Sequence, residues 1–474
     1  MLDKGGGRPV VLKHSPMPAP FTEFRGGQAG PASRTSCTGD LPLADIKTNS
    51  KTDSRRDFLA TTTAAVAATG LLNAVAVPTV HAAGNDTLKV ALVGCGGRGT
   101  GAAKDALGAD ENVKLVALGD VFKDRLDASR EQLKKIAGDK YAVEDDHCFV
   151  GFDAYKQVID SDVDVVLLAT PPHFRPAHLK YAIEKGKHVF VEKPVAVDAP
   201  GVRSVLATCD EAKKKNLNVV SGLCWRYHPA MKETVDRVLG GDVGRIVTLQ
   251  CNYNAGGLWH RDRNPNWSDM EWQLRNWLYF TWLSGDHNVE QHVHSLDKMA
   301  WVMGDKYPVA AVGLGGRQAR TGAESGHIFD HHAVCYEFPE NVRCFSYCRQ
   351  QQGAATDVSD WVFGTDGVAS LIEHEITGPK KWKFRAKRGQ KLDMYQEEHN
   401  ALFSAIRSGN TINNGDYMTK STLMAIMGRM ATYTGQKITW EQALDSKEDL
   451  TPSVYEFGSL AVPAVAIPGV TKFA

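Results

Sequence analysis

From residue 88 onward, short apolar runs alternate with amphipathic stretches. The runs are rich in Val, Leu and Ile; they are TLKVALVG, VKLVALGD, DVDVVLLATPP, KHVFVEKP and LNVVSGL. Such runs are typical of strands buried on both faces of a parallel sheet. The helical period lies between them, in TGAAKDAL, FRPAHLKYAIEKG and APGVRSVLATCDEAKKKN. The alternation predicts an α/β fold with a doubly wound parallel sheet, which binds ligands at the carboxyl ends of its strands.

The second half of the chain has a different pattern. Strands are predicted over RIVTLQCNYN, PVAAVGLGG, HHAVCYEF, VRCFSYCRQ and WVFGTDGVASL, with FPENVR as a turn between two of them. A helix is predicted over DHNVEQHVHSLD, because Val289, Val293 and Leu296 form one apolar stripe. These elements predict a second folding unit after the parallel sheet.

The first 85 residues have no such periodicity. Residues 1–53 are rich in Gly, Pro, Ser and Thr, so we expect either a disordered leader or an upstream start that is not used. SRRDFL follows at Ser54–Leu59, then a mildly apolar Ala/Thr/Gly segment, a pattern that resembles a twin-arginine export signal. Paired arginines before an Ala-rich stretch also arise by chance. We expect export in the folded state to the periplasm.

The composition argues against two classes of protein, those that bind nucleic acid and those that span a membrane. The chain has 474 residues, with 55 basic and 55 acidic side chains, which argues against a nucleic-acid partner. After residue 80 no run of about 20 apolar residues occurs, so we expect no permanent membrane span. The nine cysteines form no CxxC pair, and the eight outside the leader are predicted to be buried thiols.

The loop after the first predicted strand is rich in glycine. Gly94, Gly96 and Gly99 fit G-x-G-x-x-G, in which the glycines permit a tight turn, backbone approach to a pyrophosphate and close helix packing. Asp120 ends the second strand, where a carboxylate binds ribose hydroxyls and repels a 2′-phosphate. This favours NAD over NADP, although Lys123 and Arg125 lie nearby, and Asp120 could instead cap the next turn.

Five segments together carry a family resemblance. They are VALVGCGGRG, ATPPHFRPAH, GKHVFVEKP, GDVGRI and GDHNVEQHVHSLD, and with them the chain resembles the Gfo/Idh/MocA (glucose–fructose oxidoreductase/inositol dehydrogenase) family over most of residues 88–440. The resemblance implies a Rossmann domain, placed at 86–222, and an α/β domain with a large open, mostly antiparallel sheet, placed at 223–474. It also implies a homodimer or homotetramer formed through that sheet.

The same resemblance implies the reacting groups. Lys193 would orient the substrate hydroxyl beside the nicotinamide, His294 would act as general base, and Glu290, where relatives commonly carry Asp, would orient His294. Lys193 could also be a solvated strand-end residue paired to Glu192, and His294 a hydrogen-bonded core histidine. The predicted cofactor contacts are Gly94, Gly96, Gly97, Arg98, Gly99, Asp120, Thr170, Pro171, His173, Glu192 and Lys193.

Substrate contacts are sought among aromatic and polar side chains that suit carbohydrate rings. The candidates are Arg226, Tyr227, Trp277, Asp330 and His331, although tryptophans at such spacings are often core residues. No metal site is predicted, because the acids and histidines between His287 and Asp297 do not have the spacing of known ligand motifs.

The compartment restricts the reaction. Free NAD is expected to be scarce outside the cytoplasm, so an exported enzyme would keep its cofactor bound and regenerate it in place. The sequence therefore predicts an NAD(P)-dependent oxidoreductase acting on a sugar or polyol hydroxyl. Two alternatives stay open: a glycosidase or lyase that works through transient sugar oxidation, and a carbohydrate-binding protein without turnover.

Overall fold

The computed structural model describes residues 86–474. The predicted leader and the twin-arginine motif lie outside the described residues. Among residues 86–474, none of the helices combines the length and apolar content that crossing a bilayer requires.

The first sheet is parallel and six-stranded. Its order is β3-β2-β1-β4-β5-β6, with all neighbours parallel. The strands are β1 (Leu88–Val93), β2 (Val113–Asp120), β3 (Cys148–Val150), β4 (Val165–Leu168), β5 (His188–Val191) and β6 (Val219–Ser221). β4 and β6 are buried along their whole length and β1 at every position except Lys89, as the apolar runs predict. The predicted doubly wound sheet is confirmed. Its strand β3 is short and was not predicted, because no apolar run marks it in the sequence.

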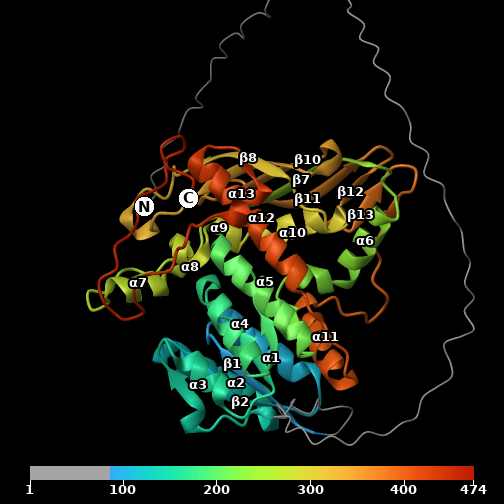
Figure 1. Ribbon diagram of the computed structural model, residues 1–474. Coiled ribbons are helices and arrows are strands. Elements are labelled where there is room, and N and C mark those ends of the chain that lie inside the picture. Colours follow the sequence, from blue (N-terminus) through green and yellow to red (C-terminus); the bar gives the residue numbers. More distant parts are fainter. Residues whose placement is uncertain (1–85) are drawn as a thin grey trace, which may run out of the picture. The chain divides into compact units, whose positions relative to one another are not determined.

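Helices connect the strands of this first sheet. They are α1 (Gly97–Ala109), α2 (Lys123–Ala137), α3 (Ala154–Asp160), α4 (Arg175–Glu184) and α5 (Ala199–Lys214). A further helix, α11 (Met394–Ser408), comes from far along the chain and packs beside α1 (Figure 1). Leu402, Phe403 and Ile406 of α11 lie in one apolar cluster with Leu92 and Leu118 of the sheet. The core around the first sheet therefore includes a late segment that lies within the range predicted for the second domain.

The second sheet is mixed and nine-stranded. Its order is β14-β13-β12-β11-β7-β10-β9-β8-β15, and only the β7–β10 pair is parallel within the described residues. The strands are β7 (Ile246–Ala255), β8 (Ala310–Gly316), β9 (His331–Glu337), β10 (Arg343–Gln350), β11 (Asp357–Gly364), β12 (Val368–Ser370), β13 (Glu375–Thr377), β14 (Trp382–Lys383) and β15 (Ile438–Thr439). The large, mostly antiparallel sheet is confirmed.

Helices cover one face of the second sheet. α12 (Gly415–Thr434) packs on β8 and β9 and contacts α5 on its other side, and α10 (Val293–Val302) packs on β7 and β11 (Figure 1). The remaining helices are α6 (Pro229–Leu239), α7 (Asp269–Arg275), α8 (Thr281–Ser284), α9 (His287–Glu290) and α13 (Trp440–Asp445). The opposite face exposes large apolar side chains from four strands: Val247, Val312, Leu314, Phe345, Tyr347 and Val358.

The helix predicted over residues 286–297 is divided in two. α9 ends at Glu290, and α10 begins at Val293. The apolar stripe of Val289, Val293 and Leu296 is buried as predicted, but Glu290 and His294 do not lie on one continuous helix.

Cysteines are free thiols throughout the described part of the chain. Six of the eight are buried, whereas Cys148 and Cys335 are partly exposed, so the prediction of eight buried thiols is wrong for these two. Both lie in strands that keep one side open to solvent, β3 and β9.

Candidate active site

A single cavity of about 580 Å³ lies at the carboxyl ends of the first sheet's strands. This volume is within the usual range for small-molecule sites, roughly 300–1,000 Å³. Residues after β1, β2, β4 and β5 form one side of it. Trp259, Arg275, Glu290, His294 and Tyr395, all from the later part of the chain, form the other.

The glycine loop forms a cradle without side chains. Gly94 has φ +99°, and a Cβ there would lie 2.6 Å from the Thr170 nitrogen; a Cβ on Gly99 would lie 1.9 Å from the Gly94 oxygen. By contrast, a Cβ on Gly96 or Gly97 would meet nothing within 4 Å, because these two face the cavity. The start of α1, with Gly96 as its N-cap and no capping side chain, presents backbone N–H groups to the same space. This arrangement fits a pyrophosphate.

Asp120 lies at the end of β2 and lines the cavity. Its carboxylate accepts hydrogen bonds from the Cys95 N–H at 2.7 Å and the Phe122 N–H at 2.9 Å. Burial raises its pKa, and these two N–H groups oppose the rise. The carboxylate therefore joins the glycine loop to the β2 turn at the place where a ribose would lie.

A buried ion-pair network fixes Arg98 beneath the glycine loop. Its guanidinium binds Glu192, at the end of β5, and Glu398 of α11. Burial alone would raise the pKa of Glu192, but Arg98 and Arg175 outweigh it and hold that pKa below its usual range. Burial raises the pKa of Glu398 well above its usual range, which Arg98 only partly opposes. Glu398 was not among the predicted residues, because α11 gives no sequence signal of where it packs.

Lys193, Glu290 and His294 all line the cavity. Lys193 Nζ lies 3.1 Å from Glu290 Oε1 and also donates to the Glu290 backbone oxygen. The pKa of His294 is held well below its usual value, first by burial and then by the cations Lys193, Lys298 and Arg98. A neutral imidazole and an ammonium therefore face the same space, which is the pairing needed for a base and an electrophilic group.

The cavity also has an aromatic and cationic wall. Trp277 lines it as predicted, with Trp259 6.5 Å away between ring centroids. Arg261 and Arg275 also line it, and Arg275 binds Asp124 through two bonds of 3.0 Å. Arg261 was missed by the sequence reasoning, since the loop that carries it has no motif.

Five predicted residues do not line the cavity. Arg226 is buried against Asp297, at 2.8–3.2 Å, and Asp305, at 2.7 Å, and Tyr227 donates to Asn414 at 2.7 Å. They lie in a 3₁₀ turn that faces α10 and α12 instead of the site. The structure therefore corrects their predicted role as substrate contacts.

Asp330, His331 and His173 are likewise held elsewhere. Asp330 accepts the N–H groups of residues 318–320 at 2.6–3.0 Å and binds His331 Nδ1 at 2.7 Å, so the pair shapes a turn before β9. His173, a predicted cofactor contact, bonds to the Tyr455 hydroxyl at 2.7 Å. The remaining predicted cofactor contacts all line the cavity.

The C-terminal segment packs on aromatic residues that line the cavity near Asp120. Phe457 stacks on Phe122 at 5.9 Å and packs on Phe152 at 5.4 Å, and both partners line the cavity. Tyr455 packs on Phe152 and Phe174 at 5.9 Å each. The Gly458 oxygen accepts the Met270 N–H at 3.1 Å, which ties the segment to α7. We refer to residues 453–460 as the C-terminal strap.

The comparisons with known proteins agree with this fold. A family model described as an oxidoreductase family with an NAD-binding Rossmann fold (GFO_IDH_MocA) matches residues 88–220. Inositol 2-dehydrogenase of Burkholderia cenocepacia is 24% identical over 341 residues, covering 68% of this chain and 87% of that protein. The 2,7-anhydro-N-acetylneuraminate hydratase of Escherichia coli is 25% identical over 177 residues; the match spans 37% of this chain and 43% of the hydratase.

Solved structures share the fold over about three quarters of the chain. Myo-inositol 2-dehydrogenase from Lactobacillus plantarum superposes with a TM-score of 0.58 at 20% identity, covering 75% of this chain and 99% of that one. Scyllo-inositol dehydrogenase from Lactobacillus casei, with NAD(H) and scyllo-inositol bound, gives 0.57 at 17% identity, covering 75% and 100%. At these identities the likeness concerns the fold.

Proposed function

We propose that this chain, whose residues 88–220 match the NAD-binding domain of the Gfo/Idh/MocA oxidoreductases, transfers hydride between a sugar or polyol hydroxyl and a tightly bound nicotinamide cofactor. One observation carries the proposal. The side-chain-free loop at Gly96 and Gly97 and the pair Lys193–His294 line one cavity although they come from distant parts of the chain. A binding protein without turnover would need no such pair.

Separate groups of residues would bind the cofactor and act on the substrate. The Gly96–Gly99 backbone and the start of α1 would hold a pyrophosphate, and Asp120 the adjoining ribose. A nicotinamide dinucleotide supplies a hydride acceptor when bound. Lys193 orients the substrate oxygen and stabilises negative charge on it, while His294 accepts the hydroxyl proton. Glu290 sets the position of the Lys193 ammonium.

Asp120 supports NAD as the preferred cofactor. A carboxylate at this position repels a 2′-phosphate, and its oxygens are already fixed by two backbone N–H groups. Arg125 also lines the cavity, so NADP is the cofactor to test beside NAD.

Cofactor retention fits the proposed export. The C-terminal strap packs on Phe122, and Asp124 binds Arg275; Phe122 and Arg275 both line the cavity, where they would hold the adenosine half. A chain exported in the folded state to the periplasm needs such retention, because free NAD is expected to be scarce there. The twin-arginine motif at Arg55–Arg56 is the sequence feature that supports this route.

A second candidate is cleavage or elimination through transient oxidation of the sugar. The similarity of part of this chain to 2,7-anhydro-N-acetylneuraminate hydratase supports this second candidate. The same Lys193 and His294 would serve, since oxidation at one carbon acidifies the neighbouring C–H and the hydride returns at the end.

The test uses the purified full chain. Acid denaturation followed by chromatography should release close to one nicotinamide dinucleotide per chain. Lasting absorbance at 340 nm with one member of a panel of inositols, aldoses and uronic acids would support net oxidation. With a second panel of glycosides, release of an aglycone or formation of an unsaturated sugar without lasting absorbance at 340 nm would support the second candidate. A chain that carries no nucleotide and binds neither NAD nor NADP would refute both.

A further inference from the structure

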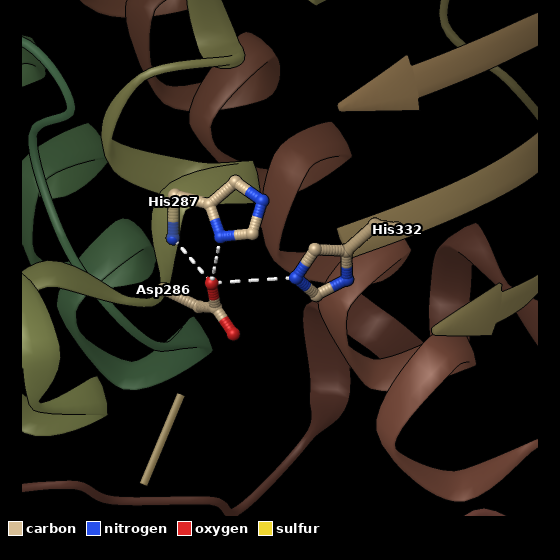
Figure 2. A group of neighbouring side chains, drawn as sticks. All are labelled: Asp286, His287 and His332. Carbon is tan, nitrogen blue, oxygen red and sulfur yellow. Dashed lines mark hydrogen bonds and ion pairs between the residues drawn. The ribbon is translucent and has the colours of Figure 1, made fainter. Parts of the chain in front are cut away.

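A second cluster of polar side chains lies outside the cavity. Asp286, His287 and His332 come together where the start of α9 meets β9 (Figure 2). One carboxylate oxygen and one nitrogen from each ring lie within 4.8 Å of one another. The three residues are 0%, 3% and 2% exposed, so water does not satisfy them. None of them lines the cavity described above.

Three of the four ring nitrogens of this cluster lack well-aligned hydrogen bonds. Both nitrogens of His287 and Nε2 of His332 are buried without a hydrogen-bond partner. Asp286 Oδ1 nevertheless lies 2.7 Å from His287 Nδ1 and 3.3 Å from His332 Nε2. Buried polar atoms are almost always paired, so this convergence calls for a ligand.

The neighbouring threonine fixes the tautomer of His332. The Thr432 hydroxyl has one hydrogen, and it donates that hydrogen within its own helix. The acceptor is the backbone oxygen of Gly428, at 3.1 Å, or of Arg429, at 2.9 Å. Thr432 Oγ1 therefore accepts from His332 Nδ1, 2.9 Å away. Neutral His332 then has its Nε2 lone pair directed at a carboxylate oxygen, and two electron pairs face each other across 3.3 Å. A cation between them removes this repulsion.

The carboxylate is oriented in the same way. Asp286 Oδ2 accepts the Tyr433 hydroxyl and the Phe329 N–H, the latter at 3.0 Å, which leaves Oδ1 for the histidines. Asp286 has φ +76°, a backbone conformation that non-glycine residues rarely adopt, and it keeps the carboxylate turned toward the cluster. Such outer contacts are what orients ligands in metal sites.

We infer that Asp286, His287 and His332 bind a divalent transition-metal ion, with Zn²⁺ the best match. Two imidazoles and one carboxylate are ligands that zinc favours. Bonds of about 2.0–2.1 Å in tetrahedral geometry place ligand atoms roughly 3.3 Å apart. The separation between Asp286 Oδ1 and His332 Nε2 has this value, whereas the 2.7 Å between Asp286 Oδ1 and His287 Nδ1 is shorter and would lengthen around a bound ion. The ion would join α9 to β9, and α9 carries Glu290, which binds Lys193. Its role is structural, and the inference is independent of the proposed function.

The test measures metal in the untagged full-length protein, produced with zinc in the medium and dialysed against metal-free buffer. We expect about one zinc per chain by mass spectrometry, because the three ligand residues are buried and a bound ion would exchange slowly. His332→Gln should lose at least nine tenths of it, whereas His331→Gln, the neighbouring partly exposed histidine on the same strand, should retain it.

Two further measurements keep the inference open to refutation if His332→Gln folds poorly. Removing the ion from the wild-type protein with dipicolinate should lower its Tm, and zinc should restore it. Cobalt in place of zinc should give the visible absorption of tetrahedral Co²⁺. Background metal content in the wild type, with no change of Tm on adding zinc, would overturn the inference and leave a protonated His332 as the cation that faces Asp286.

Discussion

At the scale of single residues, Lys193 is the group on which the proposed chemistry depends most. It is only 13% exposed, and its Nζ is aimed into the cavity by Glu290. Lys193→Met should lower kcat about 10²- to 10³-fold, the usual loss when one group that stabilises developing charge is removed. The bound nucleotide should stay at the wild-type level, because the glycine loop is unchanged.

Lys187→Met is the matched control for that variant. Lys187 immediately precedes β5, the strand that leads to Lys193, and donates to the Val163 backbone oxygen at 2.8 Å, away from the cavity. Its kcat should stay at the wild-type value. Equal losses in both variants would contradict the role given to Lys193.

His294 makes a prediction about pH. A general base must be neutral to accept a proton. Burial, together with the cations Lys193, Lys298 and Arg98, holds the pKa of His294 well below 6.5. Glu290 is the nearby carboxylate in the cavity. The base is therefore active to lower pH than an ordinary histidine. The acid limb of the kcat profile should fall below pH 6.5, and His294→Asn should remove it together with most of the activity. A limb above pH 6.5 would contradict this assignment.

Arg226 tests the distinction between a structural and a substrate-binding residue. Removing one partner of a buried ion pair costs about 3–5 kcal/mol, so Arg226→Met should lower the free energy of unfolding by that amount. The exposed Arg245→Met is the control. The KM of the folded fraction should not change; a higher KM with wild-type stability would restore Arg226 as a substrate contact.

At the scale of elements, the C-terminal strap makes the next prediction. Tyr455→Ala combined with Phe457→Ala removes the aromatic contacts to Phe122 and Phe152, so the nucleotide should leave faster, by about 10-fold for each 1.4 kcal/mol lost. Repeated gel filtration followed by nucleotide analysis measures the loss. The control is Val465→Ala, an exposed residue farther along the same segment. Retention equal to wild type would show that the strap does not hold the nucleotide.

Elements with strong local patterns were predictable, and contacts between distant elements were not. The apolar runs located β1, β2, β4, β5 and β6, and the glycine spacing located the loop and α1. The division between α9 and α10 was missed, because the apolar period of Val289, Val293 and Leu296 continues through it. His332 could not be connected to Asp286 from the sequence, since it reaches the cluster from another strand.

The same limit applies to the site. Lys193, Glu290 and His294 line one cavity with the glycine loop, as the resemblance implies. Arg226 and Asp330 were chosen for residue type alone, and buried partners take up their charges. Burial is decided by the whole fold, so residue type near a motif does not distinguish a ligand contact from a core ion pair.

At the scale of the whole molecule, the open face of the second sheet supports assembly. Val312 and Leu314 of β8 and Phe345 and Tyr347 of β10 expose apolar surface on the two strands that flank β9, and such patches mark interfaces. We propose a homodimer or homotetramer formed through this face. Leu314→Glu combined with Phe345→Glu should give a smaller species by light scattering, whereas Ile136→Glu, on exposed α2, should not. A wild-type chain that is monomeric at micromolar concentration would refute the proposal.

The position of α11 in the core also determines when that core can be completed. Leu402, Phe403 and Ile406 fill space beside strands synthesised some three hundred residues earlier, and Glu398 supplies one of the carboxylates that pair with Arg98. Domains usually fold as they leave the ribosome. In this chain the nucleotide-binding half is finished only after Ile406 has emerged, so a cofactor is captured by a nearly complete polypeptide and not by the nascent amino-terminal half.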